Sequence, residues 1–266
     1  MVLTNSPDPE EQEELASLPW FVALSQGVGI AMVILVGVWA SSYLGGFAWN
    51  GALQFNVHPL CMVVGLIFLY GEAAIVYRVF RQAEKFKSKI IHASLHLLAL
   101  LSMVIGLVAV FQFHYANNYT NLYSLHSWSG MVTVVLFCMQ FCLGFLTFLL
   151  PGAKGSIRKK YLPYHQFFGT AILIMACVSC ISGINEKLFF LNSAPNATTT
   201  GAYSNLQPVF LLGNILGLVI VVFVMLILWI LYRTEWKRKP LPEEREITVH
   251  FQRITNDDSG SDTETD

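Results

Sequence analysis

Six long apolar runs are the feature of this 266-residue chain that most limits what it can fold into. A helix needs roughly 20 apolar residues to span a bilayer. The runs cover approximately residues 20–43, 58–78, 90–113, 126–150, 164–185 and 209–232. They are too long and too continuous for strands or for half-buried amphipathic helices. The sequence therefore predicts an all-α membrane protein with six transmembrane helices in a lipid bilayer.

The composition excludes several other classes of protein. Charged residues make up only 12% of the chain and hydrophobic residues 55%, whereas a soluble domain carries about 25% charged residues. This shortage of charge excludes a disordered chain, a nucleic-acid-binding protein and an ordinary cytosolic enzyme. Four prolines are expected at helix starts, where a missing N–H is harmless, and none in the middle of a span. They are Pro19, Pro59, Pro163 and Pro208.

The distribution of Lys and Arg predicts the orientation of the spans. Fifteen of the 16 basic residues lie in the second connection, the fourth connection and the C-terminal tail, and only Lys187 lies elsewhere. An even number of spans places both termini on the side of these connections, which the positive-inside rule assigns to the cytosol. We expect a cytosolic acidic tail over residues 1–19, a six-helix domain over 20–232 and a cytosolic disordered tail over 233–266.

Two glycosylation sequons fall in connections predicted to face away from the cytosol. Asn196 begins the one in the longest connection, which agrees with that side. Asn118 begins the second, but it lies so close to the next span that we expect it to be unmodified.

Five histidines lie within or at the ends of the apolar runs, where an ionisable residue is a functional hypothesis by default. The second and fourth runs begin on the non-cytosolic side, so His58 and His126 are predicted near that face. The third and fifth begin on the cytosolic side, which predicts His92 and His165 near the cytosolic face. The two levels are on the order of 20 Å apart. His96 follows His92 by one turn and faces the same side, so spacing alone does not choose between them.

Two imidazoles at each level suit the axial positions of a haem iron. Zinc would usually take further Cys, His or carboxylate ligands, and a proton relay would include more acidic residues than Glu72 alone. The chain has no Cys-x-x-Cys-His attachment motif, so the haems would be non-covalent and b-type. Two histidines fill the coordination of the iron, which favours electron transfer over oxygen activation. The alternative is that these histidines only pack at helix ends.

Short motifs around the histidines resemble a known family. They include Phe55-Asn56-Val57-His58-Pro59, Leu122-Tyr123-Ser124-Leu125-His126-Ser127-Trp128, Leu162-Pro163-Tyr164-His165 and Glu186-Lys187-Leu188. From about residue 18 to 250 the chain resembles the cytochrome b561 family of six-span, di-haem membrane proteins. It looks most like the chromaffin-granule type, although residues 183–190 also resemble the lysosomal relative. The resemblance implies a central bundle of the second to fifth spans that holds two b-type haems, paired as derived above.

The resemblance also implies the substrates. Ascorbate would be the cytosolic electron donor, and this monoanion would bind three cations near the cytosolic haem. They are Lys85, Lys89 and Arg158. These cations could instead only set the topology or contact lipid phosphates. On the other side the family places a histidine that contacts substrate or metal, here His114. Tyr123 and Ser124 are further candidates there, although an interfacial anchor and an N-cap explain them equally well.

The implied function is electron transfer from cytosolic ascorbate to the monodehydroascorbate radical inside a secretory vesicle. A related alternative is reduction of ferric ion at a plasma or lysosomal membrane. A different class is a carrier that uses the histidines for protons or metal ions, but the lack of interrupted helices and inverted repeats counts against it. Homodimers occur in the family, and a homodimer is possible here.

The remaining polar groups of the spans are expected to pack. All five cysteines lie within apolar runs, which predicts no loop disulfide, and Cys177 and Cys180 are interpreted as small apolar packing residues. Glu72 lies deep in the second run, six residues before Arg78. We expect it to pair with a basic side chain that reaches inward, such as Arg78, and a role in proton coupling is the alternative.

Overall fold

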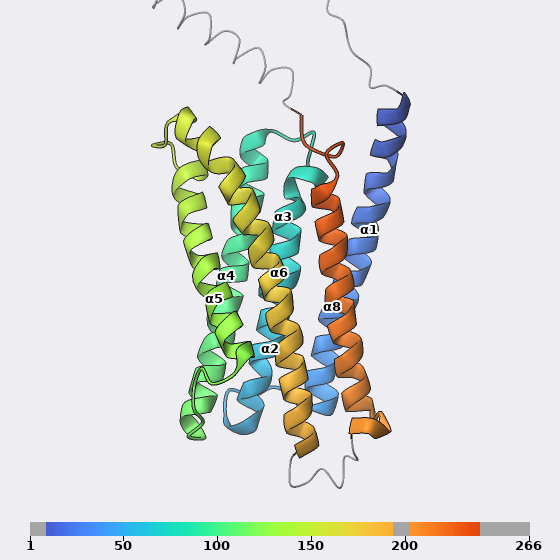
Figure 1. The fold of residues 1–266 in the computed structure, drawn as a ribbon, viewed down its shortest axis with the longest axis vertical. Coiled ribbons are helices and arrows are strands. Elements are labelled where there is room, and N and C mark those ends of the chain that lie inside the picture. Colours follow the sequence, from blue (N-terminus) through green and yellow to red (C-terminus); the bar gives the residue numbers. More distant parts are fainter. Residues whose placement is uncertain (1–8, 194–202, 240–266) are drawn as a thin grey trace, which may run out of the picture.

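A computed structural model describes residues 9–193 and 203–239 of the chain (Figure 1). It contains six helices that are long and apolar enough to cross a membrane, which confirms the predicted number of spans. The spans are Leu15–Tyr43, Gly51–Val79, Lys85–Ala116, Leu125–Leu149, Gly155–Ser193 and Pro208–Tyr232. Asn196, residues 1–8 of the first predicted tail and residues 240–266 of the second lie outside the described residues.

Several spans combine more than one kind of helix. Helix α1 (Pro9–Val38) continues into a π-helical turn, η1 (Trp39–Tyr43). The second span joins the 3₁₀ helix η2 (Gly51–Asn56), α2 (Val57–Met62), the π-helical η3 (Val63–Leu69) and α3 (Tyr70–Val79). Then follow α4 (Lys85–Ala116), α5 (Leu125–Gly144) with η4 (Phe145–Leu149), α6 (Gly155–Ser193), η5 (Tyr203–Asn205) and α8 (Pro208–Tyr232).

The prediction that prolines mark helix starts is wrong at two positions. Pro19 lies inside α1 and Pro163 lies inside α6, because both helices begin well before their apolar runs. Both prolines are exposed and precede the apolar part of the helix. Because proline has no N–H, the backbone carbonyl one turn before each of them loses its helical hydrogen-bond partner. Water can solvate that carbonyl near the membrane surface. Pro208 opens α8 as predicted.

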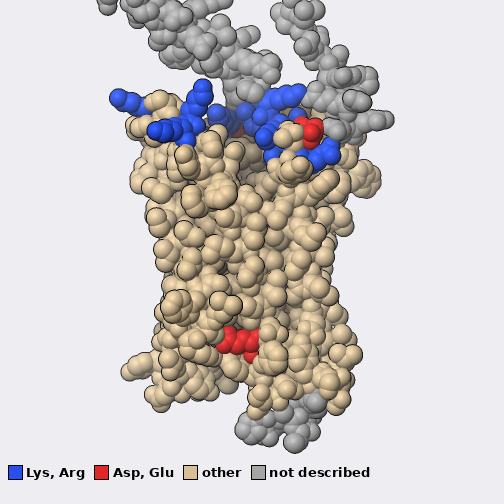
Figure 2. Space-filling view, in the orientation of Figure 1, with Lys and Arg blue, Asp and Glu red and all other residues tan. Residues whose placement is uncertain are grey.

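The basic side chains gather at one end of the bundle (Figure 2). This is the end where α1 begins and α8 ends (Figure 1). We call it the basic end, and the other the opposite end. The positive-inside rule assigns the basic end to the cytosol. The two described chain ends therefore lie on the predicted side of the molecule.

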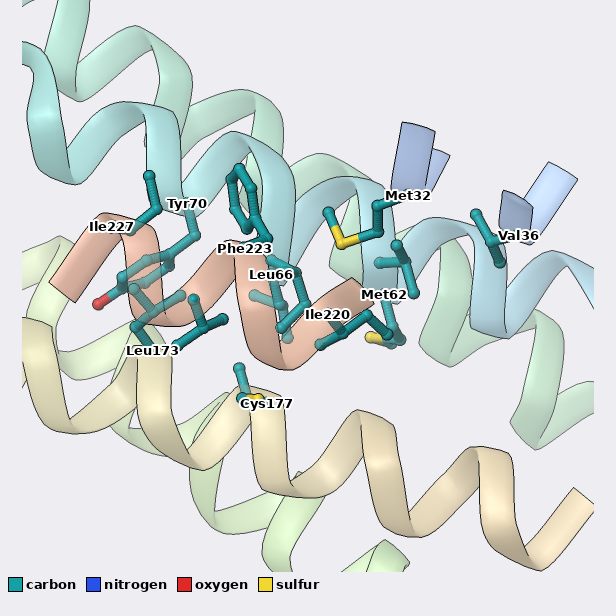
Figure 3. Packing of buried hydrophobic residues seen from close by; sticks show 14 of the residues in the cluster. Met32, Val36, Met62, Leu66, Tyr70, Leu173, Cys177, Ile220, Phe223 and Ile227 are labelled. Carbon is teal, nitrogen blue, oxygen red and sulfur yellow. The ribbon is translucent and has the colours of Figure 1, made fainter. Parts of the chain in front are cut away.

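Helix α1 packs against α8 and the second span, and α8 packs against the second span and α6. Figure 3 shows this contact, where Met32 of α1, Leu66 of the second span and Phe223 of α8 meet. Cys177 of α6 belongs to the same buried cluster, as its packing interpretation requires. The second span also packs on α4, and α5 packs on α6. The second to fifth spans thus form the central bundle, with α1 and α8 at its side.

The predicted pairing of Glu72 with Arg78 is wrong. Gln26 of α1 donates a hydrogen bond to Glu72 Oε2 over 2.7 Å. Arg78 instead donates to the carbonyls of Leu231 and Arg233, over 2.6 and 2.8 Å, and so caps the end of α8. Six residues are not a whole number of helical turns, so the two side chains of α3 face different neighbours.

Candidate cofactor and substrate sites

The first histidine pair lies towards the opposite end of the bundle. The rings of His58, from α2, and His126, from α5, are 6.1 Å apart between centroids. Nδ1 of His58 lies 3.2 Å from the carbonyl oxygen of Gly106, and Nδ1 of His126 lies 2.9 Å from that of Ser179. Nδ1–H groups that donate to carbonyls leave both Nε2 atoms as acceptors, the arrangement typical of metal-ligating histidines.

The second pair lies towards the basic end. The rings of His92, from α4, and His165, from α6, are 6.2 Å apart. Nδ1 of His92 lies 2.7 Å from the carbonyl oxygen of Ala73. Nδ1 of His165 is buried and has no hydrogen-bond partner in the described part of the chain. A backbone carbonyl therefore orients only one ring of this pair.

Both separations suit a metal ion held between two imidazoles. Two metal–nitrogen bonds of about 2 Å, together with half the width of each ring, span roughly 6 Å. The described residues contain no group of three or more His, Cys, Asp or Glu side chains that could hold a metal ion. The donor sets therefore fit an iron that brings its own equatorial ligands, as in haem, better than they fit zinc.

Two glycines of the α5–α6 contact make room for the imidazoles. A Cβ atom on Gly183 of α6 would lie 2.6 Å from the ring of His126, and one on Gly144 of α5 would lie 2.8 Å from the ring of His165. Each helix thus places a glycine against the histidine of the other. The sequence analysis did not identify these positions, because the sequence of one helix does not determine its register against a neighbouring helix.

A cavity adjoins the pair of His58 and His126. Its walls are largely apolar and come from the second span, α4, α5 and α6, with contributions from α1 and α8. Val63 and Leu66, from the π-helical segment η3, form part of the wall. Such π-helical turns within α-helices are frequent at functional sites. An apolar slot between two imidazoles is the environment that a haem macrocycle requires.

His96 packs beside the second pair. Its ring lies 4.6 Å from that of His92 and 4.7 Å from that of Tyr70. Its Nδ1 is buried and without a hydrogen-bond partner among the described residues. The separation of 6.2 Å between His92 and His165 fits a shared metal ion, and His96 lies as a polar neighbour of that pair. The choice of His92 over His96 as ligand stays a prediction.

The structure brings the three predicted ascorbate contacts together at the basic end. Lys89 donates to the carbonyl of Phe148 over 2.9 Å, and Arg158 donates to carbonyls at the same end of the fourth span over 3.1 and 3.2 Å. The charge of Lys85 lies close enough to interact with that of Lys89. The Phe148 ring is 5.1 Å from that of His165. Lysine offers three donors and arginine five, so donors remain for an anion.

The three residues predicted at the other substrate site line the cavity of the first pair. Nδ1 of His114 is buried without a hydrogen-bond partner among the described residues. Ser124 is the N-cap of α5 and accepts a bond from the Ser127 N–H over 3.3 Å. Partial burial, and then the charge and hydrogen bonding of Glu186, raise the pKa of Tyr123. The phenol therefore remains a hydrogen-bond donor at neutral pH.

Two charged residues of α6 at this end were given no role in the sequence analysis, which noted them only in a family motif and, for Lys187, as an exception to the charge distribution. Glu186 accepts a hydrogen bond from Ser124 Oγ over 3.1 Å, and Lys187 places its ammonium 4.5 Å from the centroid of the Phe55 ring. Both line the same cavity. The isolated position of Lys187 among the basic residues was the signal that could have found it.

The profile of the eukaryotic cytochrome b561 family matches residues 57–191, which contain all four paired histidines. The chain belongs to the cytochrome b561 family. Membership in this family implies haem b as the prosthetic group, and the two imidazole pairs and the apolar cavity fit it. The matched region begins in α2 and ends in α6, so it covers the second to fifth spans.

Curated relatives within the cytochrome b561 family are similar over most of their length. The chain is 44% identical to a protein named transmembrane ascorbate-dependent reductase CYB561 from Ovis aries, over 92% of this chain and 94% of the relative. It is 44% identical to the Homo sapiens protein of that name, over 91% and 94%. It is 46% identical to the lysosomal membrane ascorbate-dependent ferrireductase CYB561A3 from Homo sapiens, over 79% and 87%.

Proposed function

We propose that this cytochrome b561 protein transfers electrons across a membrane, from ascorbate in the cytosol to an acceptor on the other side. The observation that carries the proposal is the presence of two imidazole pairs of metal-binding geometry towards the two ends of one bundle. The names of the relatives given above, ascorbate-dependent reductases and an ascorbate-dependent ferrireductase, support the donor.

Each pair would hold one b-type haem, His58 with His126 and His92 with His165. Haem held by two imidazoles would supply reversible one-electron chemistry. The protein orients three of the four imidazoles through backbone carbonyls. Largely apolar side chains also line the cavity beside the first pair.

At the basic end, Lys85, Lys89 and Arg158 would bind ascorbate. This donor is a monoanion at neutral pH, and the three charges lie together where η4 ends. Lys89 and Arg158 are held in place by carbonyls of that segment, so they meet the anion with little further ordering. Phe148 lies between Lys89 and His165 and places the bound donor beside the second pair.

At the opposite end, the acceptor we favour is the monodehydroascorbate radical, which fits a secretory-vesicle membrane. His114 would contact it through its unpaired Nδ1, with Tyr123 and Ser124 at the rim of the cavity. Ferric ion is the second candidate, because a carboxylate, that of Glu186, also lies at this end. A plasma or lysosomal membrane would suit that alternative.

The test uses sealed proteoliposomes that contain the purified, haem-loaded protein and a trapped acceptor. We expect external ascorbate to reduce ferricyanide inside vesicles whose basic end faces outward. Vesicles without protein are the control. Reduction that needs a membrane-permeant mediator, or none at all, would contradict the proposal.

A further inference from the structure

Lys187 is the single Lys or Arg that the structure describes near the opposite end, and it lies next to the first histidine pair. Its ammonium is 4.5 Å from the centroid of the Phe55 ring, and that ring is 6.3 Å from the ring of His58. The side chain is partly buried and lines the cavity of that pair. A lone cation thus lies one aromatic ring away from a proposed haem ligand.

The charge of Lys187 is not balanced within the part of the chain that the structure describes. The neighbouring carboxylate, Glu186, instead accepts a hydrogen bond from Ser124, and Tyr123 lies close to it. No carboxylate of the described residues lies within ion-pairing distance of the Lys187 ammonium. An aromatic face offsets only part of the cost of removing a charge from water. A partly buried ammonium at the edge of a cavity therefore suits an anion that arrives from outside.

We propose that Lys187 selects an anionic electron acceptor at the opposite end of the protein. The inference rests on the proposed function and names the charge of its acceptor. The monodehydroascorbate radical is a monoanion. It takes one electron from the reduced protein and one proton from water on that side, and leaves as the ascorbate monoanion. The charge that Lys187 binds is the same before and after the step, so substrate and product exchange without a large change in affinity.

Glu186 is a positioning residue in this proposed site for an anion. Its carboxylate is engaged at the start of α5, so it neither neutralises Lys187 nor fills the space over Phe55. A site for a ferric ion would require the reverse, with the carboxylate available and the ammonium paired. The two neighbouring side chains of α6 thus favour an anion over a cation.

The experiment compares oxidants of opposite charge on the full-length, haem-loaded protein. Proteoliposomes with the opposite end outward are filled with ascorbate and mixed with monodehydroascorbate, ferricyanide or hexaammineruthenium(III). We expect Lys187→Gln to raise the KM for monodehydroascorbate about tenfold. The rate of ferricyanide reduction should fall by a similar factor. The cationic oxidant should react as fast as before or faster. Lys187→Arg should keep the wild-type pattern, and Lys154→Gln, an equal change of charge at the basic end, should have no effect.

Two results would overturn the inference. Equal slowing of all three oxidants would show that Lys187 only supports the fold. A shift in the haem midpoint potential with unchanged KM values would show that its ammonium pairs with a carboxylate of the bound haem. Failure of ascorbate to reduce the wild-type protein would overturn the proposed function instead. The charge test would then be repeated with dithionite-reduced protein, where it still decides the role of Lys187.

Discussion

The two histidine pairs have nearly the same ring separation but different surroundings. At the opposite end, backbone carbonyls orient both rings, and a largely apolar cavity adjoins them. At the basic end the carbonyl of Ala73 in α3 orients His92 alone, and His165 is held by packing against Phe148 and Tyr161. Hydrogen-bond partners of metal ligands affect metal affinity by roughly 10–100-fold. We therefore expect the first haem to be held more firmly than the second.

The charges around the two pairs differ as well. The basic end offers several cations whose positions are fixed by carbonyls of η4. The opposite end offers one ammonium, and the neighbouring carboxylate is already engaged. Both ends would thus accept an anion, the basic end through a cluster of cations and the opposite end through Lys187 alone. This difference predicts a stronger dependence of donor binding on ionic strength at the basic end.

The largest expected effect is the loss of one haem when a ligand is removed. His126→Ala should remove the opposite-end haem and His92→Ala the basic-end haem, so that the haem-to-protein ratio falls from two to about one in each. The pyridine haemochrome assay measures this ratio. His96→Ala is the matched control. If it lost a haem that His92→Ala kept, the assignment of His92 would be wrong.

The next effect concerns the glycines that face the rings. Gly183→Ala should weaken retention of the opposite-end haem, and Gly144→Ala that of the basic-end haem, because each added Cβ would lie less than 3 Å from an imidazole. Overpacking of this kind costs about 1–3 kcal/mol. Haem loss during gel filtration measures it. Gly152→Ala, where nothing lies within 4 Å of the added atom, should behave as the wild type.

A smaller effect is expected on donor binding. Lys89→Met and Arg158→Met should each raise the KM for ascorbate about tenfold, since each removes one charge-assisted contact. Rates of haem reduction by ascorbate at several concentrations give this value, and reduction by dithionite should be unchanged. An unaltered KM in both variants would leave these residues with a topological role only.

The smallest effect separates capping from substrate binding at Ser124. Ser124→Ala removes the N-cap of α5 and should lower stability by about 1 kcal/mol. Ser124→Thr keeps the hydroxyl and should retain the stability. Thermal unfolding in detergent measures both variants. A large rise in the KM for the acceptor without a loss of stability would instead identify Ser124 as a substrate contact.

The sequence was sufficient to predict the architecture and the depth of each histidine. Long apolar runs and the distribution of Lys and Arg determine how many spans there are and at which end each one begins. The pairing of His58 with His126 and of His92 with His165 follows from that depth, and the structure brings both pairs of rings together.

Features that depend on rotation between helices could not be predicted in the same way. The carbonyls that face the imidazoles and the glycines Gly144 and Gly183 depend on the register of neighbouring helices. Glu72 was assigned to Arg78 from their distance along one helix, whereas its partner, Gln26, lies on another. Lys187 was counted as an exception in the topology, because its contact with Phe55 arises only when the second span meets α6.

The haem content and reducibility of the purified wild-type protein test the central claim most directly. We predict two b-type haems per chain by the pyridine haemochrome assay, both converted to the reduced spectrum by ascorbate. One haem per chain, or two haems that dithionite reduces and ascorbate does not, would contradict the account.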